Sequence, residues 1–247
     1  PDPTVERQSG FLTPGTRDSN NLGLSFDIPY YYVISDNKDL TLKPRFYFDD
    51  QVILQNEYRQ VNKNSSHIVD FSINSSNYFN KKNQTKTHIF SNSRFNIDLE
   101  KFDYTNLEIN IEKTSNDTYL KTYKLDSPLI RNNSSLNSYL EFETERDSLS
   151  LKASFEMYED LTKNKTDRYE FIYPNYKIVK KIDLDGKNYN ELSFSSYGHQ
   201  KNYQTNIYES TVINDLFFSK DMEVSENGLK NNFSGIIKNV NLDAKNS

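Results

Sequence analysis

Apolar residues recur at every second position along most of this chain, and this alternation limits the folds that it can adopt. The first clear run contains Leu22, Leu24, Phe26 and Ile28, separated by Gly23, Ser25 and Asp27. The same pattern recurs in residues 39–48, 107–113 and 149–160. Successive side chains of a strand lie on opposite faces of a sheet, so each run predicts a strand with one apolar and one polar face. The sequence therefore predicts an all-β protein.

Turn-forming residues separate these runs. The connecting segments are rich in Asn, Asp and Ser, which tolerate the backbone conformations of tight turns, and Asp185-Gly186 is a typical hairpin dipeptide. At about 20 residues for a strand and its connector, the chain has room for about 12 strands. We expect an antiparallel meander that forms a single domain over residues 1–247.

The hydropathy pattern excludes a helical membrane protein but is compatible with a transmembrane β-barrel. No apolar run reaches the roughly 20 residues that a membrane-spanning helix needs. A transmembrane β-barrel needs apolar side chains only at alternate positions over about 10 residues, as in these runs. Although hydrophobic residues make up 34% of the chain, its 18 Tyr and 16 Phe indicate an ordered protein. A part of a large barrel and a soluble β-sandwich both fit this pattern.

Charge and composition argue against several function classes. The net charge of -5 comes from acids and bases scattered along the chain, without the basic block of a nucleic-acid-binding protein. The absence of cysteine excludes disulfides and thiolate chemistry. The three histidines, His67, His88 and His199, have no second ligand or carboxylate at a useful spacing, so we expect surface or lumen positions and no metal. We find no nucleophile or phosphate-binding motif, and we expect neither enzymatic activity nor a cofactor.

Three prolines lie within or against the first alternating runs. Proline has no N–H and therefore removes a hydrogen bond from a strand ladder. In the ordinary interpretation Pro14 starts a strand, Pro29 ends one and Pro44 occupies a β-bulge. The residues after Pro29, Tyr30 to Tyr32, fit either the aromatic girdle of a membrane barrel or the end of a soluble sheet.

The opening stretch resembles the start of the barrel domain of the LPS-assembly protein LptD family, also called organic solvent tolerance proteins. The matching residues are Arg7, Ser9, Gly10, Phe11, Leu12 and Pro14, then Ile28, Pro29, Tyr30 and Tyr31, then Asp39, Thr41 and Pro44, and finally Glu57 and Arg59. The match covers about the first 60 residues closely, and residues 168–178 resemble a later strand. Tyr32 departs from the family, which often has Trp there. By this resemblance we expect the chain to be the first part of the barrel, without the family's periplasmic domain and the C-terminal strands of the barrel.

The resemblance implies a function. Members of the family form a translocon in the outer membrane of Gram-negative bacteria that receives lipopolysaccharide from a periplasmic bridge of Lpt proteins. A lipoprotein plug, LptE, lies inside the barrel. The first and last barrel strands form a seam that opens sideways, and the lipid leaves through this gate into the outer leaflet. By this resemblance Pro14 and Pro29 are the prolines that weaken the gate, because each deletes a ladder bond.

The barrel hypothesis also assigns the two faces of the first strands. Arg or Lys in the middle of a bilayer costs about 2 to 4 kcal/mol, so Asp27, Lys43 and Arg45, which share one face, are expected in the lumen. We expect the alternate residues Leu22, Leu24, Phe26, Leu40, Leu42 and Phe46 to face lipid. Two alternatives remain at this stage, a porin-like barrel without a gate and a soluble carbohydrate-binding β-sandwich.

Overall fold

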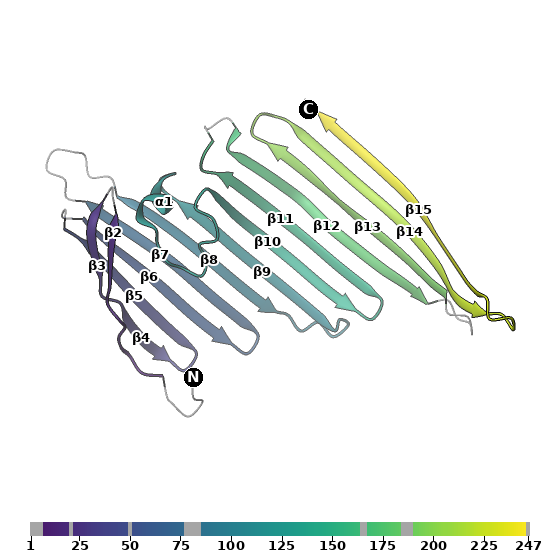
Figure 1. Cartoon of the computed structure of the whole chain (residues 1–247), viewed down its shortest axis with the longest axis horizontal. Helices are drawn as coiled ribbons and strands as arrows, with labels where there is room; N and C mark the ends of the chain where they lie inside the picture. The colour runs from purple at the N-terminus through teal and green to yellow at the C-terminus, as the bar shows by residue number, and fades with distance from the viewer. Residues whose placement is uncertain are drawn as a thin grey trace. The chain divides into compact units, whose positions relative to one another are not determined.

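The computed structural model describes residues 7–19, 22–48, 51–76, 85–163, 167–183 and 190–245. Within these ranges the chain is built of β-strands that follow one another in sequence order in an open antiparallel sheet (Figure 1). The strand order is β1-β4-β5-β6-β7-β8-β9-β10-β11-β12-β13-β14-β15, with β2 and β3 paired beside this path. The predicted all-β meander is confirmed, and the hairpin signal at Asp185-Gly186 lies outside the described residues.

The described strands are longer toward the C-terminus. They are β1 (Gly10–Phe11), β2 (Gly15–Ser19), β3 (Gly23–Asp27), β4 (Tyr30–Ser35), β5 (Lys38–Tyr47), β6 (Gln51–Asn62), β7 (Ser65–Ser76), β8 (Lys86–Asn96), β9 (Tyr104–Thr114), β10 (Ser135–Arg146), β11 (Leu149–Asp160), β12 (Tyr169–Asp183), β13 (Asn190–Tyr203), β14 (Tyr208–Val224) and β15 (Lys230–Lys245). These 15 elements exceed the predicted 12, partly because Pro14 separates β1 from β2 and Pro29 separates β3 from β4.

The chain divides into two compact units. Unit 1 comprises Pro1–Phe95, Glu108–Ser138 and Glu159–Thr162, and unit 2 comprises Asn96–Leu107, Tyr139–Tyr158 and Lys163–Ser247. The single domain expected over residues 1–247 stays a prediction. Among the described residues, no helix combines the length and the apolar character that crossing a membrane requires.

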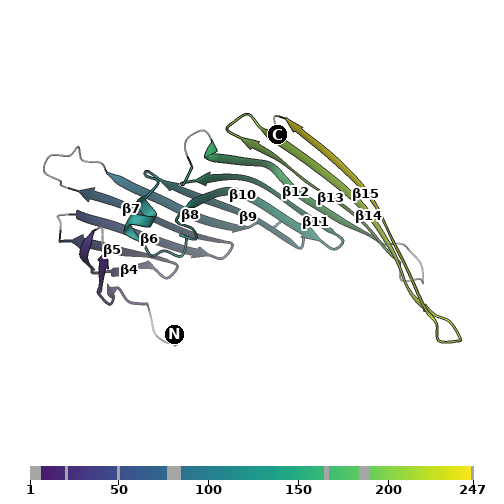
Figure 2. The ribbon, with the colours of Figure 1, turned by 45° about the horizontal axis from the view of Figure 1, so that its top comes forward.

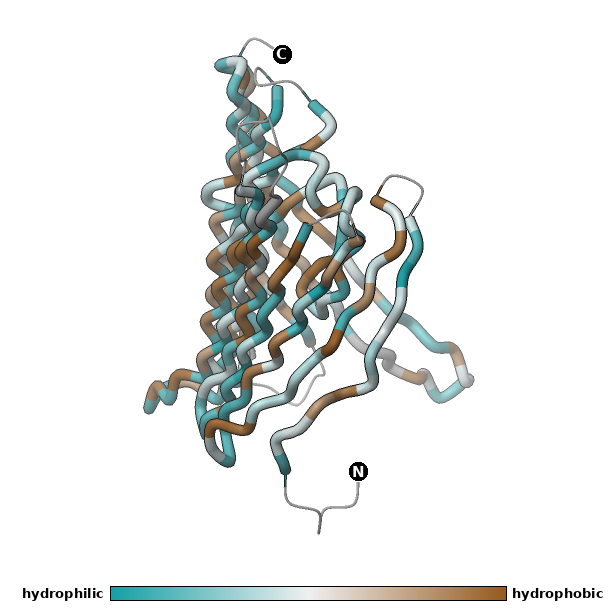
Figure 3. The backbone as a smooth tube through the Cα atoms, turned by 90° about the vertical axis from the view of Figure 1, so that its left-hand side faces the viewer, coloured by the Kyte–Doolittle hydropathy of each residue, from teal (hydrophilic) through white to brown (hydrophobic). Residues whose placement is uncertain are grey.

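Unit 1 has one polar and one apolar sheet face. On β5, the side chains of Asp39, Thr41 and Arg45 are buried on the polar face. On the opposite face, Leu54 of β6 lies beside Ile73 of β7, and both are exposed. The same alternation of hydrophilic and hydrophobic residues is visible along the strands in Figure 3. Each strand therefore separates polar from apolar side chains as the sequence predicts.

The apolar core of unit 1 lies on the polar face, where the short helix α1 (Tyr119–Tyr123) covers it (Figure 2). The core consists of Tyr47, Ile53, Phe90, Tyr119, Leu120, Tyr123, Leu125, Leu136 and Leu161. Leu22 packs against this core, so its predicted lipid-facing position is wrong. The reason is its place in the turn between β2 and β3, where the alternation of the strand no longer fixes the direction of the side chain.

Unit 2 contains long antiparallel hairpins whose polar side chains pair across strands. The ammonium of Lys238 on β15 lies 2.9 Å from the carboxylate of Asp215 on β14, and Lys152 lies 2.8 Å from Glu141. Gly198 of β13 is packed between its neighbours: a Cβ there would lie 2.3 Å from the carbonyl oxygen of Thr211 and 3.2 Å from the ring of Tyr176. The aromatic ring occupies the space that a side chain would otherwise fill.

We predict that Gly198→Ala destabilises the protein by about 1 to 3 kcal/mol, the usual effect of an overpacked methyl group. The backbone oxygen of Thr211 cannot retreat without distorting the β13–β14 ladder. Gly235→Ala on β15 is the matched control, because its new Cβ would meet no atom within 4 Å. Denaturant unfolding of the two variants checks the prediction, and equal unfolding midpoints would contradict it.

Candidate functional site

Pro29 interrupts the ladder between the first two strands of the sheet. The first strand consists of β1 and β2, and the second consists of β3 and β4. The pairs Gly10↔Tyr31 and Phe11↔Tyr30 continue to Leu12 and Pro29, where the Leu12 N–H donates to the Pro29 carbonyl at 2.9 Å. Two residues opposed in this way normally exchange two hydrogen bonds. Pro29 has no N–H, so the Leu12 carbonyl receives no bond in return.

Pro14 lies where the register of the first strand shifts. Leu12 opposes Pro29, whereas Gly15 opposes Asp27, so the first strand holds one more residue than its partner between these two pairs. Such an extra residue is a β-bulge, and Pro14 falls within it. Pro14 directly precedes β2, as the ordinary interpretation expected.

Pro44 has a different position from the one expected. It lies inside β5 and opposes Leu54 in an unbroken register with β6, so the expectation of a bulge is wrong. On its other side the Pro44 carbonyl accepts the N–H of Ile28 at 3.3 Å, and again no N–H is available for the reciprocal bond. Three neighbouring strands thus each carry a proline at adjacent positions.

The first strand is held by few residue pairs. Among the described residues, β1 pairs with β4 at two positions and β2 with β3 at five, whereas β6 and β7 pair at twelve. The ring of Phe11 supports the short β1 segment by an edge-to-face contact with Tyr30, with the centroids 5.0 Å apart. The Ser9 hydroxyl also accepts the N–H of Val33 at 2.8 Å. The edge strand is therefore fastened in part by side chains.

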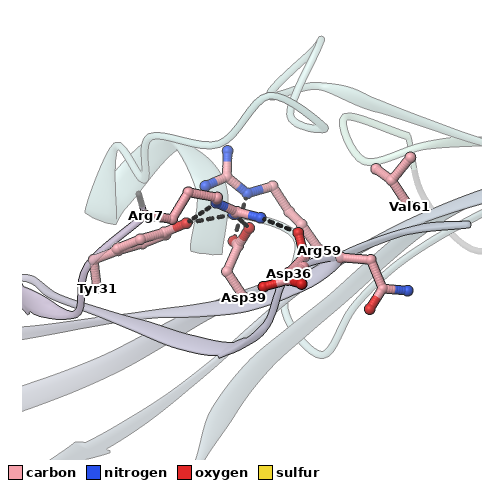
Figure 4. A pocket seen from close by; sticks show the side chains of 7 residues that line it. Arg7, Tyr31, Asp36, Asp39, Arg59 and Val61 are labelled. Atoms are coloured by element: carbon pink, nitrogen blue, oxygen red, sulfur yellow. Dashed lines mark hydrogen bonds and ion pairs between the residues drawn. The ribbon is translucent and has the colours of Figure 1, made fainter. Parts of the chain in front are cut away.

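A charged cluster lies at the start of the first strand and contains residues that carry the family resemblance (Figure 4). Arg7 forms an ion pair with Asp39 and donates to the Tyr31 hydroxyl. Arg59 of β6 donates to the other oxygen of Asp39 at 2.8 Å. The hydrogen bond to Tyr31, followed by that to Asp39, raises the pKa of Arg7, so this guanidinium stays charged. One buried carboxylate thus joins the chain before β1 to β5 and β6.

The cluster continues along the polar face. Glu57 lies 3.7 Å from Arg59 and accepts a hydrogen bond of 2.9 Å from Lys43, so positive and negative groups alternate. The pocket beside the cluster has a volume of about 530 Å³ and is lined by Arg7, Tyr31, Asp36, Asn37, Asp39, Arg59 and Val61. The positive charges of two arginines and the negative charges of two aspartates cancel in this lining. The arrangement therefore suits fastening of the chain better than capture of a free anion.

The predicted lumen residues Asp27, Lys43 and Arg45 all belong to the polar face of unit 1. Lys43 is part of the charged cluster. Arg45 is buried and donates to the carbonyl of Tyr123, the last residue of α1, at 2.8 Å. Asp27 opposes Arg45 in the β3–β5 ladder and lies 3.9 Å from Arg17 of β2. Arg45 thus satisfies a carbonyl that the helix itself leaves unpaired.

The seat of α1 contains polar residues that sequence reasoning missed. The Ser72 hydroxyl lies 2.6 Å from both the Tyr119 hydroxyl and Nδ1 of His88. Nε2 of His88 lies 3.3 Å from the buried carboxylate of Asp70. Burial raises the pKa of Tyr119 to about 12. The sequence shows no carboxylate at a useful spacing from His88, because Asp70 lies on the neighbouring strand and strand pairing is not visible in residue spacing.

No family model matches the chain. The chain is 25% identical over 242 residues to the LPS-assembly protein LptD of Pseudomonas syringae pv. syringae, which covers 94% of this chain and 24% of that protein. It is 31% identical over 114 residues to LptD of Paraburkholderia xenovorans, covering 46% of this chain and 14% of that protein. LptD of Nitrosococcus oceani is 39% identical over 56 residues, or 23% of this chain and 8% of that protein. The chain thus spans at most about a quarter of these relatives.

We predict that Asp39→Asn frees the segment before β1, because Arg7 and Arg59 share this carboxylate. Trypsin should then cleave after Arg7 about five- to tenfold faster, in line with the loss of one charge-assisted hydrogen bond. Asp36→Asn is the matched control, because Arg7 contacts the backbone carbonyl of Asp36 and an asparagine keeps it. Equal cleavage rates in the two variants would show that Asp39 does not fasten this segment.

Proposed function

Because the chain is related to the LptD family of LPS-assembly proteins, we propose that it is part of an outer-membrane barrel that inserts lipopolysaccharide into the outer leaflet. In this proposal the first barrel strands form one side of a lateral gate, and Pro14 and Pro29 lower the cost of opening it. The role is one of transport, without catalysis or a cofactor.

The distribution of side chains supports a membrane location. In a soluble protein, large apolar side chains are buried and charged ones are exposed. In the described part of unit 1, the buried side chains include Asp39, Glu57 and Asp70, while Leu54 and Ile73 are exposed side by side. Contiguous exposed apolar surface of this kind is typical of contact with lipid or another protein. A soluble β-sandwich would instead bury its apolar faces between two sheets.

The main observation that supports the gate is the incomplete hydrogen bonding of the Leu12–Pro29 pair. It holds one hydrogen bond where two are possible, and Ile28–Pro44 repeats this on the next strand pair. Each missing bond reduces the net stability by about 0.5 to 1.5 kcal/mol, and more in lipid, where an unpaired carbonyl has no water to bind. The first strand can therefore separate from the second at a lower cost than an equally long strand pair without the proline.

The partners follow from the same proposal. Lipopolysaccharide would pass along the polar face, whose carboxylates, amides and hydroxyls suit a saccharide. An LptE-like lipoprotein plug would occupy the lumen, a periplasmic bridge of Lpt proteins would deliver the lipid, and membrane lipid would cover the apolar face. Nucleic acid has no place in this scheme, since the chain has a net charge of -5.

A porin-like barrel without a gate is the second candidate. It would account equally well for the alternating faces. It gives no reason for Arg7, Tyr31, Asp39, Glu57 and Arg59 to converge in one cluster beside the first strand. The distinction between the two candidates is whether lipopolysaccharide touches the proline-bearing strands.

Photo-crosslinking in cells tests the proposal. A photoreactive residue at Leu12 or Phe26, in the whole natural protein, should form adducts with lipopolysaccharide, since both side chains are exposed beside the prolines. Phe155 of β11 is the matched control, an exposed aromatic residue far along the sheet from these strands. If the protein reaches the outer membrane but Leu12 and Phe26 yield no more adduct than Phe155, the porin-like candidate replaces the gate.

A further inference from the structure

The C-terminal end of α1 is held by side chains from three strands. Arg45 of β5 donates to the Tyr123 carbonyl at 2.8 Å, and Gln55 of β6 donates to the Asp126 carbonyl at 3.0 Å. Arg17 of β2 donates to the Lys124 carbonyl at 3.2 Å and forms an ion pair with the Asp126 carboxylate. The carbonyls that follow the last turn of a helix lack intrahelical partners, so these side chains complete its end.

Two of the three side chains belong to the body of the sheet and one belongs to its edge. Gln55 and Arg45 lie on β6 and β5, which pair at nine positions from Lys38↔Gln60 to Phe46↔Val52. Arg17 lies on β2, which together with β3 forms an edge hairpin joined to β5 at Ser25↔Tyr47, Phe26↔Phe46 and Asp27↔Arg45. The end of α1 therefore connects the edge hairpin to the sheet, in addition to the connection that the β3–β5 ladder makes.

Leu22 supplies a further contact in this connection. It lies in the turn of the edge hairpin and packs against the apolar core that contains Tyr119, Leu120 and Tyr123 of α1. The helix is itself anchored in the sheet by the hydrogen bond between Tyr119 and Ser72 of β7. The edge hairpin is thus held to the sheet both by the short β3–β5 ladder and by its contacts with α1.

We propose that α1 and the residues up to Asp126 form a strap that holds the edge hairpin of β2 and β3 against the sheet. Release of α1 from its seat loosens the hairpin, and separation of the hairpin withdraws Arg17 and Leu22 from α1. Because coupling between two sites is reciprocal, each movement favours the other. The inference goes beyond the proposed function, and it rests on contacts within unit 1 alone.

The polar seat makes such a release physically accessible. Asp70, Ser72, Asn74 and His88 are buried beneath or beside α1, so undocking of the helix exposes several polar groups at once. Water can satisfy these groups when the helix leaves, which lowers the cost of undocking. The lowered pKa of Asp126, caused mainly by its hydrogen bond from Arg17, keeps that carboxylate charged at neutral pH.

Distance measurements by electron paramagnetic resonance test the strap. Spin labels are attached through bioorthogonal side chains at Asp18 of β2 and Lys63 of the β6–β7 turn, both exposed, in the whole protein. In Arg17→Ala we expect the population with longer label distances to rise about fivefold, from the loss of one ion pair and one hydrogen bond. In the double variant Tyr119→Ala and Leu120→Ala, which removes two core side chains of α1, the same population should rise.

Lys238→Ala is the control, because it removes a comparable ion pair with Asp215 in unit 2. It should leave the Asp18–Lys63 distances as in the wild type. The proposal is overturned if Arg17→Ala leaves these distances unchanged, or if the α1 variant folds and leaves them unchanged. It is also overturned if Lys238→Ala shifts them as much as Arg17→Ala does. The measurement needs neither lipopolysaccharide nor transport, so its failure would be distinct from a failure of the proposed function.

Discussion

Pairing of backbone N–H and carbonyl groups between neighbouring strands is the constraint on which the rest of this structure depends. The apolar side chains of unit 1 are largely exposed on one sheet face, and its small apolar core forms where α1 covers the other face. Burial of apolar surface between sheets therefore contributes less here than in a soluble β protein. In a membrane the ladder becomes more important still, because no water replaces a missing bond. The strength of each strand pair then depends on how many such bonds it contains.

This constraint gives the prolines their effect. Pro29 and Pro44 each remove one bond from a pair that would otherwise have two, and Pro14 lies in the bulge beside them. Side-chain contacts offset the loss on both sides of this interruption. Asp39 fastens Arg7 toward one end of β5, and Arg17 meets the end of α1 near Arg45 toward the other. Side chains can release and re-form without breaking a ladder, so this edge combines order with a low cost of separation.

The alternating pattern of the sequence was sufficient to predict an antiparallel all-β meander with one polar and one apolar face, although it gave about 12 strands where the described residues form 15. It failed for Leu22, because a turn does not maintain the alternation, and for Pro44, because a proline can face a break in the neighbouring strand without forming a bulge. Contacts between distant parts of the chain were not visible. His88 meets Asp70 and Arg45 meets Tyr123 through strand register and through the folding of α1 onto the sheet. The resemblance singled out Arg7, Asp39 and Arg59, but only the structure shows that both arginines contact the Asp39 carboxylate.

Amide hydrogen exchange in the lipid-embedded protein tests most directly whether the prolines weaken the first strand pair. Pro29→Ala supplies the N–H that the Leu12 carbonyl lacks, whereas Pro128→Ala changes a proline outside the strands and serves as the control. If the account is right, Pro29→Ala slows exchange at Leu12, whose N–H is bonded to residue 29, by about two- to tenfold, as one added hydrogen bond should, and Pro128→Ala does not. Unchanged exchange in Pro29→Ala would mean that the missing bond does not limit opening, and the account of the gate would be wrong.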